Sequence, residues 1–431
     1  MRHDSIIQRV LPRLLATSPT VAALALAGLF IWEGAEAADA ASKPKPPRPR
    51  VPAIRVAAGA LDRHDSIVSL ELPAGLHEAV SVKGPDGKRI PLQVDPEGHG
   101  WLIVESLPAG SNRVYIIDPR PKSPPRHPGC ELEFEEGELQ FSIQRQPVIT
   151  YHHEPGNLPR PGIQPSFTRG AYLHPVLTPG GVAVTDDYAT NHLHHHGIWS
   201  SWPHTRFEGR APDFWNMGQG KGTVIPLSLD SFWEGNIQGG FVSRMRYYDL
   251  TTTPRRLALE ETWRFRIYAV GGKTPRYRLF DLATHQVASS PSPLELLEYR
   301  YGGLGVRGRE EWNGAAKAAF LTSEGETNRV RANTTRARWC TMGGEIDGRY
   351  AGMAILCHPD SFRAPQPMRI HPDEPFFCYA PPQAGDFTIG QNAPYDAQYR
   401  FVVFDGPPDP ALLNRLWEDW THPAEATLEA L

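Results

Sequence analysis

The sequence predicts an all-β protein, a large antiparallel β-supersandwich preceded by a small β-sandwich domain. The chain holds 43 prolines and 39 glycines among 431 residues, above average usage, yet 40% of it is hydrophobic. This composition favours short strands joined by turns over disorder. In "LEETWRFRIYAV", Trp263, Phe265 and Ile267 alternate with polar side chains, the period of a half-buried strand. Only "DPALLNRLWEDWTHP", near the end, has helical spacing.

The N-terminus predicts export. Arg2, Arg9 and Arg13 form a basic leader before the apolar run Val21–Trp32, and small-x-small cleavage patterns follow. We expect a signal peptide over residues 1–40, because this apolar run is too short to span a bilayer comfortably. An uncleaved anchor is the alternative. No later apolar run reaches the roughly 18 residues of a transmembrane helix. The expected location is periplasmic or extracellular.

Three further segments complete the expected organisation. A Pro-rich linker covers residues 41–52, a small β-sandwich with a "PDGK" hairpin turn covers 53–128, and the large domain covers 129–431. Within the large domain, a hairpin turning at Asp347-Gly348 brings Cys340 and Cys357 into one neighbourhood. Their register is off by about two residues, so a disulfide is compatible with the pattern and not required by it.

The charge balance argues against a nucleic-acid partner. Lysine and arginine total 44 against 48 aspartates and glutamates, a formal charge of −4. Nucleic-acid binding normally leaves a basic imbalance or patch.

The stretch "TNHLHHHGIWSSW" carries the densest group of chemically versatile side chains. If it is extended, His192, His194 and His196 share one face and can bind a transition metal such as copper, zinc or iron. Alternatively, one of His192, His194 and His195 acts as a catalytic acid or base, with His194 or His195 favoured, since imidazole titrates near neutral pH. The third interpretation is hydrogen bonding within a loop. The next glutamate is Glu208, so the spacing differs from the HxH-plus-Glu pattern of cupins.

The residues around the histidines favour a ligand site. Trp199, Trp202 and Trp215 can stack on sugar rings, and Asp213 and Asn216 can supply directional hydrogen bonds. Each tryptophan taken alone is better explained as a core residue, and it is their density in one short window that favours a ligand site.

Other segments add candidate catalytic groups. Arg369 and His371 lie two apart in "PQPMRIHP", and His285 lies within the strand pattern "LATHQV". "GGLGVRGREEW" contributes Arg307, Arg309, Glu310 and Glu311. If these side chains converge, one site acquires the histidines and arginines that acid–base chemistry on an oxygen-rich substrate requires.

The motifs resemble those of a family of exported bacterial proteins known as methane-oxygenase-like, or PmoA-like. The matching segments are "LHPVLTPGGVAVTDDYATNHLHHHGIW", "FEGRAPDFWNMG", "YRYGGLGVRG", "ARWCTMGG" and "PQPMRIHP", within roughly residues 165 to 420. That family's histidine motif, His-x-His-His, is matched by His192, His194 and His195, and His196 departs from it. The resemblance implies a fold similar to the galactose-mutarotase supersandwich, with a carbohydrate-type cleft on its concave sheet. Methane oxidation is not the expected activity, because that membrane enzyme needs transmembrane helices.

We therefore expect an exported carbohydrate-active enzyme of the epimerase, glycosidase or lyase type, with a sugar or glycan as its ligand. A metal-dependent oxidoreductase or hydrolase and a non-catalytic glycan-binding protein are the alternatives. The cofactor stays open between none and a transition metal.

Overall fold

The computed structural model describes residues 51–118, 123, 129–272 and 274–431. The expected signal peptide and nearly all of the expected linker lie outside the described residues. The residues from 51 onward belong to one compact unit. Among the described residues, no helix is both long and apolar enough to cross a membrane.

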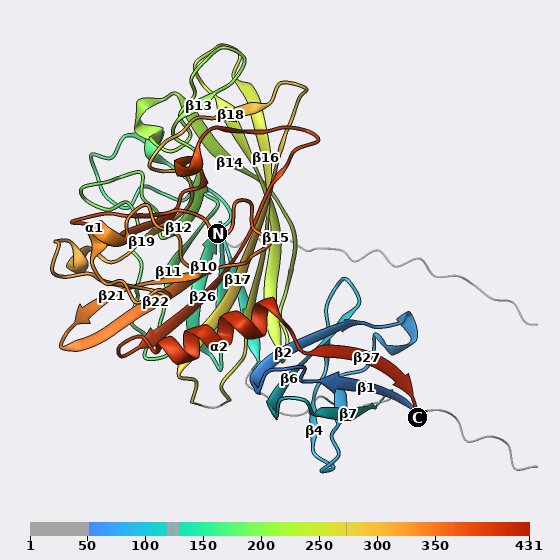
Figure 1. Cartoon of the computed structure of the whole chain (residues 1–431). Helices are drawn as coiled ribbons and strands as arrows, with labels where there is room; N and C mark the ends of the chain where they lie inside the picture. The colour runs from blue at the N-terminus through green and yellow to red at the C-terminus, as the bar shows by residue number, and fades with distance from the viewer. Residues whose placement is uncertain (1–50, 119–122, 124–128, 273) are drawn as a thin grey trace, which may run out of the picture. The chain divides into compact units, whose positions relative to one another are not determined.

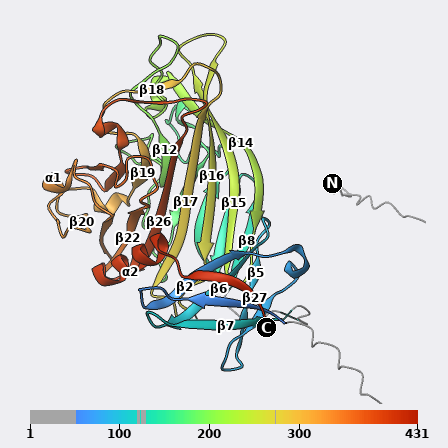
Figure 2. The ribbon, with the colours of Figure 1, turned by 45° about the vertical axis from the view of Figure 1, so that its right-hand side comes forward.

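Two eight-stranded antiparallel sheets make up the large domain (Figures 1 and 2). The first sheet contains, in spatial order, β23 (Met368–Ile370), β24 (Phe376–Tyr379), β19 (Gly303–Arg307), β12 (Ile198–Ser201), β11 (Tyr172–Val176), β10 (Gln146–His152), β9 (Glu138–Ile143) and β8 (Cys130–Glu135). The second contains β14 (Gly222–Trp233), β15 (Gln238–Asp249), β16 (Arg256–Tyr268), β17 (Tyr277–Ala288), β26 (Tyr395–Asp405), β22 (Arg349–Cys357), β21 (Trp339–Ile346) and β20 (Ala319–Thr322). A small sheet of β13 (Thr205–Arg206), β18 (Leu294–Leu296) and β25 (Phe387–Ile389) accompanies them.

The main core lies between the two large sheets. Trp263, Phe265 and Ile267 of β16 are fully buried, as their alternation predicted, and belong to one cluster with residues of the first sheet. The ring of Phe141 in β9 lies 5.4 Å from that of Phe265, and Tyr151 in β10 stacks on Phe241 in β15 at 4.0 Å. The all-β class and the large antiparallel supersandwich are confirmed.

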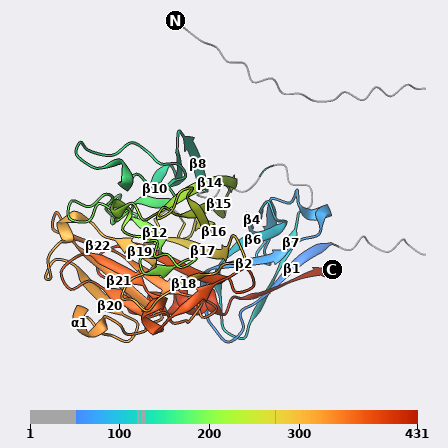
Figure 3. The same ribbon diagram turned by 90° about the horizontal axis from the view of Figure 1, so that it is seen from above.

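Two smaller sheets form a second layered unit with its own core (Figure 3). One contains β27 (Glu425–Ala430), β1 (Pro52–Ala57), β7 (Asn112–Ile117), β3 (Ser81–Lys83) and β4 (Arg89–Pro91), and the other contains β2 (Arg63–Glu71), β6 (His99–Leu107) and β5 (Gln93–Val94). Strand β27 comes from the C-terminus and pairs along the whole of β1. Residues 425–430 therefore lie outside the large domain to which we assigned them.

The helical segment and the hairpin both form where expected. Helix α2 covers Pro410–Thr421, and Asp409 is its N-cap. The Asp409 side chain accepts hydrogen bonds from two backbone amides of the first turn. The other α-helix, α1 (Arg329–Ala332), is a single turn. In the β21–β22 hairpin, Cys340 lies opposite Ile355, two residues from Cys357, and all four cysteines are free and buried.

Period-two alternation in the first sheet decides which side chains reach its outer face. In β24, Phe377 and Tyr379 enter the main core, whereas Phe376 and Cys378 belong to a separate cluster with Trp199 and Trp215. This outer cluster is the floor of the site described next.

Candidate functional site

The histidine-rich stretch forms a turned loop that leads into β12. The backbone amides of His192 and His195 bond to the carbonyls of Ala189 and His192, and the Tyr188 amide bonds to the carbonyl of His195. Because these bonds close within the loop, the stretch is not an extended strand. His192, His194 and His196 therefore do not share one face.

Three of the four imidazoles form one cluster. The rings of His192 and His195 stack with their centroids 4.7 Å apart and their planes 13° apart. The ring of Phe376 stacks on the opposite face of His195, at a centroid distance of 4.8 Å. His194 packs edge-on against His195 at 4.6 Å. His195 is buried, while His192 and His194 are half-buried at the surface.

A buried arginine and a carboxylate hold the cluster. Arg307 at the end of β19 is fully buried and donates to Glu374 Oε2 at 2.8 Å, and to the side chains of Asn191 and Asn313. The same Glu374 oxygen lies 3.1 Å from His192 Nδ1, although the angle does not complete a hydrogen bond. Arg307 Nη1 lies 3.4 Å from His195 Nδ1, which must accept because a guanidinium has no acceptor. Glu374 thus connects the arginine to the accessible histidine.

The clustered histidines are biased toward their neutral forms. Burial lowers the pKa of His192, with Glu374 opposing and Arg307 reinforcing the shift. Burial also lowers the pKa of His194 to about 3 and that of His195 well below its usual value, and the neighbouring imidazoles add to both shifts. Neutral imidazoles can accept a proton or bind a metal ion at neutral pH.

Arg369 and His371 lie beside this cluster, a convergence that the sequence left open. His371 Nδ1 accepts from the backbone amides of Asp373 and Glu374, which leaves the proton of the neutral ring on Nε2. Burial lowers the pKa of His371, with Arg369 and His192 among the groups that add to the shift. Arg369 lies over the ring of the half-buried Tyr301 and donates to its hydroxyl at 3.3 Å.

The predicted tryptophans do not offer open stacking faces. Trp199 is fully buried and Trp215 is 3% exposed, and their rings pack 5.1 Å apart beneath His195. Gly305 permits this packing, because a Cβ there would lie 3.0 Å from both indoles. Trp202 points into the main core, where its Nε1 donates to Gln286. Trp199 and Trp215 therefore support the site rather than contact a ligand directly, and Trp202 is a residue of the main core.

Asp213 and Asn216 form a turn rather than a ligand contact. The Asp213 carboxylate accepts from the backbone amides of Trp215 and Asn216 and from the Asn216 side chain, at 2.8 to 2.9 Å. This turn positions Trp215 under the histidines.

Two predicted histidines lie elsewhere. His196 is fully buried and its Nδ1 lies 2.6 Å from Asp187 Oδ1, so it cannot join His192 as a metal ligand. His285 is exposed on the outer face of the second sheet, 2.8 Å from Asp396, whereas its neighbours Thr284 and Gln286 point into the main core. His285 is therefore not part of the site.

A different set of ligands could hold a metal ion. One ligand atom each from His192, His195 and Glu374 lies within 4.8 Å of the others. Nitrogen and carboxylate donors suit zinc and other transition metals. Arg307 opposes a cation here, since it already binds both Glu374 and His195.

Sequence reasoning missed Glu374, Tyr301 and Phe376. Glu374 follows the candidate His371 by three residues, so a search for carboxylates beside candidate histidines would find it. Phe376 and Tyr301 carry no signal of their own, because their place depends on how β19 and β24 pair.

No curated protein matches the chain. Among solved structures, it is similar to an α-mannosidase from Enterococcus faecalis V583, with a TM-score of 0.40 and 10% identity over 89% of this chain and 46% of that one. It is equally similar to a glycosyl hydrolase family 38 protein from Enterococcus faecalis, with a TM-score of 0.40 and 9% identity over 89% of this chain and 48% of that one. The chain spans about half the length of these structures.

The resemblance to methane-oxygenase-like proteins stays a prediction. A family model described as DUF6807, a family of unknown function, matches residues 138–418, which is more than half of the chain and includes every residue of the histidine site. The chain therefore belongs to the DUF6807 family.

Proposed function

We propose that the protein is an exported carbohydrate-active enzyme that uses His192 as its general base and His371 as a hydrogen-bond donor that polarises a substrate oxygen. The observation that carries the proposal is the Arg307–Glu374–His192 arrangement. Arg307 holds Glu374 at 2.8 Å, and Glu374 lies 3.1 Å from Nδ1 of the half-buried His192. A carboxylate on Nδ1 orients an imidazole and leaves Nε2 free to take a proton. Poor alignment of this contact is common in ligand-free sites.

The two histidines have complementary roles. The pKa of His192 is lowered by burial, so the ring is neutral and able to accept a proton near pH 7. His371 carries its proton on Nε2 because two backbone amides occupy Nδ1. His192 can remove a proton from a substrate carbon or hydroxyl while His371 donates a hydrogen bond to a substrate oxygen. This pairing suits the proton abstraction of an epimerase or lyase, whereas a glycosidase would need a further group to protonate the leaving oxygen.

Arg369 and Tyr301 supply the binding side of the proposal. The guanidinium has a buried Nε without a hydrogen-bond partner among the described residues, and it lies over a half-buried aromatic ring. Nη1 of Arg369 already donates to Asn333 Oδ1 and to the Ile370 carbonyl. The Nη2 edge of the planar guanidinium is therefore the part that would bind a sugar hydroxyl.

The test is a screen of monosaccharides, glycosides and oligosaccharides against the full chain, with products followed by chromatography and NMR. We expect His192→Ala and His371→Ala each to lower kcat/KM by about 10²- to 10⁴-fold. His285→Ala is the matched control, since this exposed histidine lies on the other large sheet, and it should retain full activity. Turnover that survives both site substitutions would exclude the proposed roles. Saturable glycan binding without any product would favour the non-catalytic alternative.

A metal-dependent oxidoreductase or hydrolase is the second candidate, because one ligand atom each from His192, His195 and Glu374 lies within 4.8 Å of the others. It predicts about one equivalent of a transition metal per chain by mass spectrometry. The metal should be absent from a His192→Ala/His195→Ala double variant and retained by His196→Ala.

Export is part of the proposal and rests on the leader over residues 1–40. Cell fractionation of the full chain, with Edman sequencing of the recovered protein, tests both the location and cleavage near residue 40. A protein recovered from the cytoplasm with its leader intact would contradict it.

A further inference from the structure

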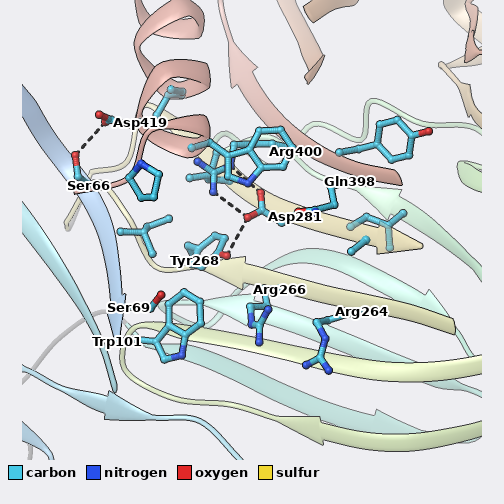
Figure 4. A pocket seen from close by; sticks show the side chains of 18 of the residues that line it. Ser66, Ser69, Trp101, Arg264, Arg266, Tyr268, Asp281, Gln398, Arg400 and Asp419 are labelled. Atoms are coloured by element: carbon cyan, nitrogen blue, oxygen red, sulfur yellow. Dashed lines mark hydrogen bonds and ion pairs between the residues drawn. The ribbon is translucent and has the colours of Figure 1, made fainter. Parts of the chain in front are cut away.

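We propose that a cavity between the small sheets, helix α2 and the second large sheet binds one neutral sugar unit. This proposal does not depend on the function of the histidine site. The cavity has a volume of about 250 Å³. Its walls come from β2 and β6 of the small sheets, from β16, β17 and β26, and from α2 (Figure 4).

The cavity and the histidine site belong to different surfaces of the sandwich. Arg264 and Arg266 line the cavity and alternate along β16 with Trp263 and Phe265, which face the main core. The histidine site lies on the outer face of the first large sheet, over the Trp199 cluster. The main core between the sheets therefore separates the two sites, and a ligand of one does not contact the other.

The charges that line the cavity are balanced. The wall contains three arginines (Arg264, Arg266 and Arg400) and three aspartates (Asp65, Asp281 and Asp419). Arg264 pairs with Glu97, and Arg266 pairs with Asp95 and Glu97, outside this set. Asp281 accepts from Arg400 at 2.7 and 2.8 Å and from the Tyr268 hydroxyl at 2.9 Å, and Asp419 is held by Arg63 and Ser66. A charged ligand would leave one of these groups without compensation, so the lining favours a neutral ligand.

The same lining has free hydrogen-bonding capacity. Ser69 and Gln398 are exposed residues of the wall, and neither side chain has a hydrogen-bond partner in the described part of the chain. The buried Nε of Arg266 also lacks a partner there. Hydroxyl, amide and guanidinium groups on different parts of the wall can bond to the hydroxyls of a sugar, each of which both donates and accepts.

Aromatic rings supply the apolar part of the wall. The half-buried indoles of Trp101 and Trp420 line the cavity, and Trp101 is fixed because its Nε1 donates to Asp95 at 2.9 Å. Indoles pack well against the C–H face of a pyranose ring. Since a cavity of about 150 Å³ holds benzene, the observed volume has room for one pyranose unit and not for a buried oligosaccharide. The small sheets thus contribute directly to the binding site.

The experiment titrates methyl glucopyranoside, galactopyranoside and mannopyranoside into the ¹⁵N-labelled full chain and follows the indole N–H resonances, assigned with Trp101→Phe and Trp420→Phe. We expect at least one neutral glycoside to shift the Trp101 resonance saturably. A Ser69→Ala/Gln398→Ala variant should weaken this binding at least tenfold. The control Thr388→Ala/Gln391→Ala, which changes exposed residues outside the cavity wall, should bind as the wild type does, and His192→Ala should too.

Four outcomes would overturn the proposal. The first is that no neutral glycoside shifts the Trp101 resonance. The second is that the Ser69/Gln398 variant, with unchanged near-UV circular dichroism, binds within twofold of the wild type. The third is that methyl glucuronoside or glucosamine binds more tightly than the neutral glycosides, which would identify a charged-ligand site. Loss of Trp101 shifts in His192→Ala would also contradict it, because the two sites would then not be independent.

Discussion

Two glutamates of this protein lie in polar networks of opposite character. Glu261 in β16 is fully buried between the large sheets, and its carboxylate accepts from Tyr247, Trp263, Thr284 and Gln286 at 2.5 to 2.9 Å. Glu374 lies at the surface of the first sheet, with one strong partner in Arg307 and an incomplete contact to His192.

The difference separates structural from functional chemistry. Around Glu261, four side chains of the core each donate a hydrogen bond to the carboxylate, and this network fixes their positions relative to one another. Around Glu374 the protein leaves imidazoles half-buried, neutral and only loosely bonded. Buried polar groups without hydrogen-bond partners lower the stability of the fold unless a ligand supplies the missing bonds. A closed network predicts loss of stability on mutation, and an open one predicts loss of activity.

The largest expected effect tests that contrast directly. Glu261→Ala leaves several buried donors unpaired, and we expect the free energy of unfolding to fall by about 3–5 kcal/mol. Glu374→Gln keeps an acceptor for Arg307 and should cost about 1 kcal/mol, while lowering any turnover that depends on His192. Urea unfolding of both variants measures the difference. Equal losses of stability would remove the distinction between the two networks.

The packing beneath the histidines gives the next effect. Gly305→Ala places a Cβ 3.0 Å from Trp199 and Trp215, and overpacking of this kind costs about 1–3 kcal/mol. Because these indoles support His195, ligand affinity at the histidine site should fall as well. Gly75→Ala is the control, since its Cβ would meet nothing within 4 Å. A Gly305→Ala protein as stable as the control would mean that the tryptophan floor is not tightly packed.

Sequence patterns predicted the sheets well because the signal is local. The alternation of Trp263, Phe265 and Ile267 alone decides which face of β16 is buried. The turn at Asp347-Gly348 likewise specifies a hairpin from adjacent residues. Strand β27 was misplaced because its pairing with β1 joins the two ends of the described chain, and no local pattern encodes such a contact.

The site was predicted only in part for the same reason. His192, His194, His195, Arg369 and His371 do converge, but the loop conformation of the histidine stretch depends on backbone bonds that close within it. In that conformation His196 is directed toward Asp187, and the third group beside His192 and His195 is Glu374. His285 lies in a strand whose alternating residues define two faces, but the alternation does not show which of the two faces is near the site.

Histidines on the first sheet should also make stability depend on pH. Burial lowers the pKa of His174 in β11 to about 4, whereas the unfolded chain titrates near 6.5. Between those values the unfolded state binds more protons, so stability is full above about pH 6.5 and falls as the pH falls toward 4, by at most about 1.4 kcal/mol per unit. In urea unfolding at pH 7 and pH 5, His174→Asn should lose less stability on acidification than the wild type. An identical pH dependence would contradict the burial of a neutral ring at this position.

The smallest effect distinguishes a supporting residue from a ligand contact within the site itself. Asp213 closes the turn that carries Trp215, and Asp213→Ala should cost about 1 kcal/mol, the usual effect of losing side-chain bonds to backbone amides. Asp213→Asn retains a side-chain oxygen that can accept from those amides, so its stability and its ligand affinity should both lie close to the wild type. A residue that bound substrate through its negative charge would behave differently, because the asparagine variant would then be stable yet unable to bind. Measuring unfolding and glycan affinity for the two variants side by side therefore decides whether Asp213 belongs with Glu261, as part of the framework, or with Glu374, as part of the chemistry.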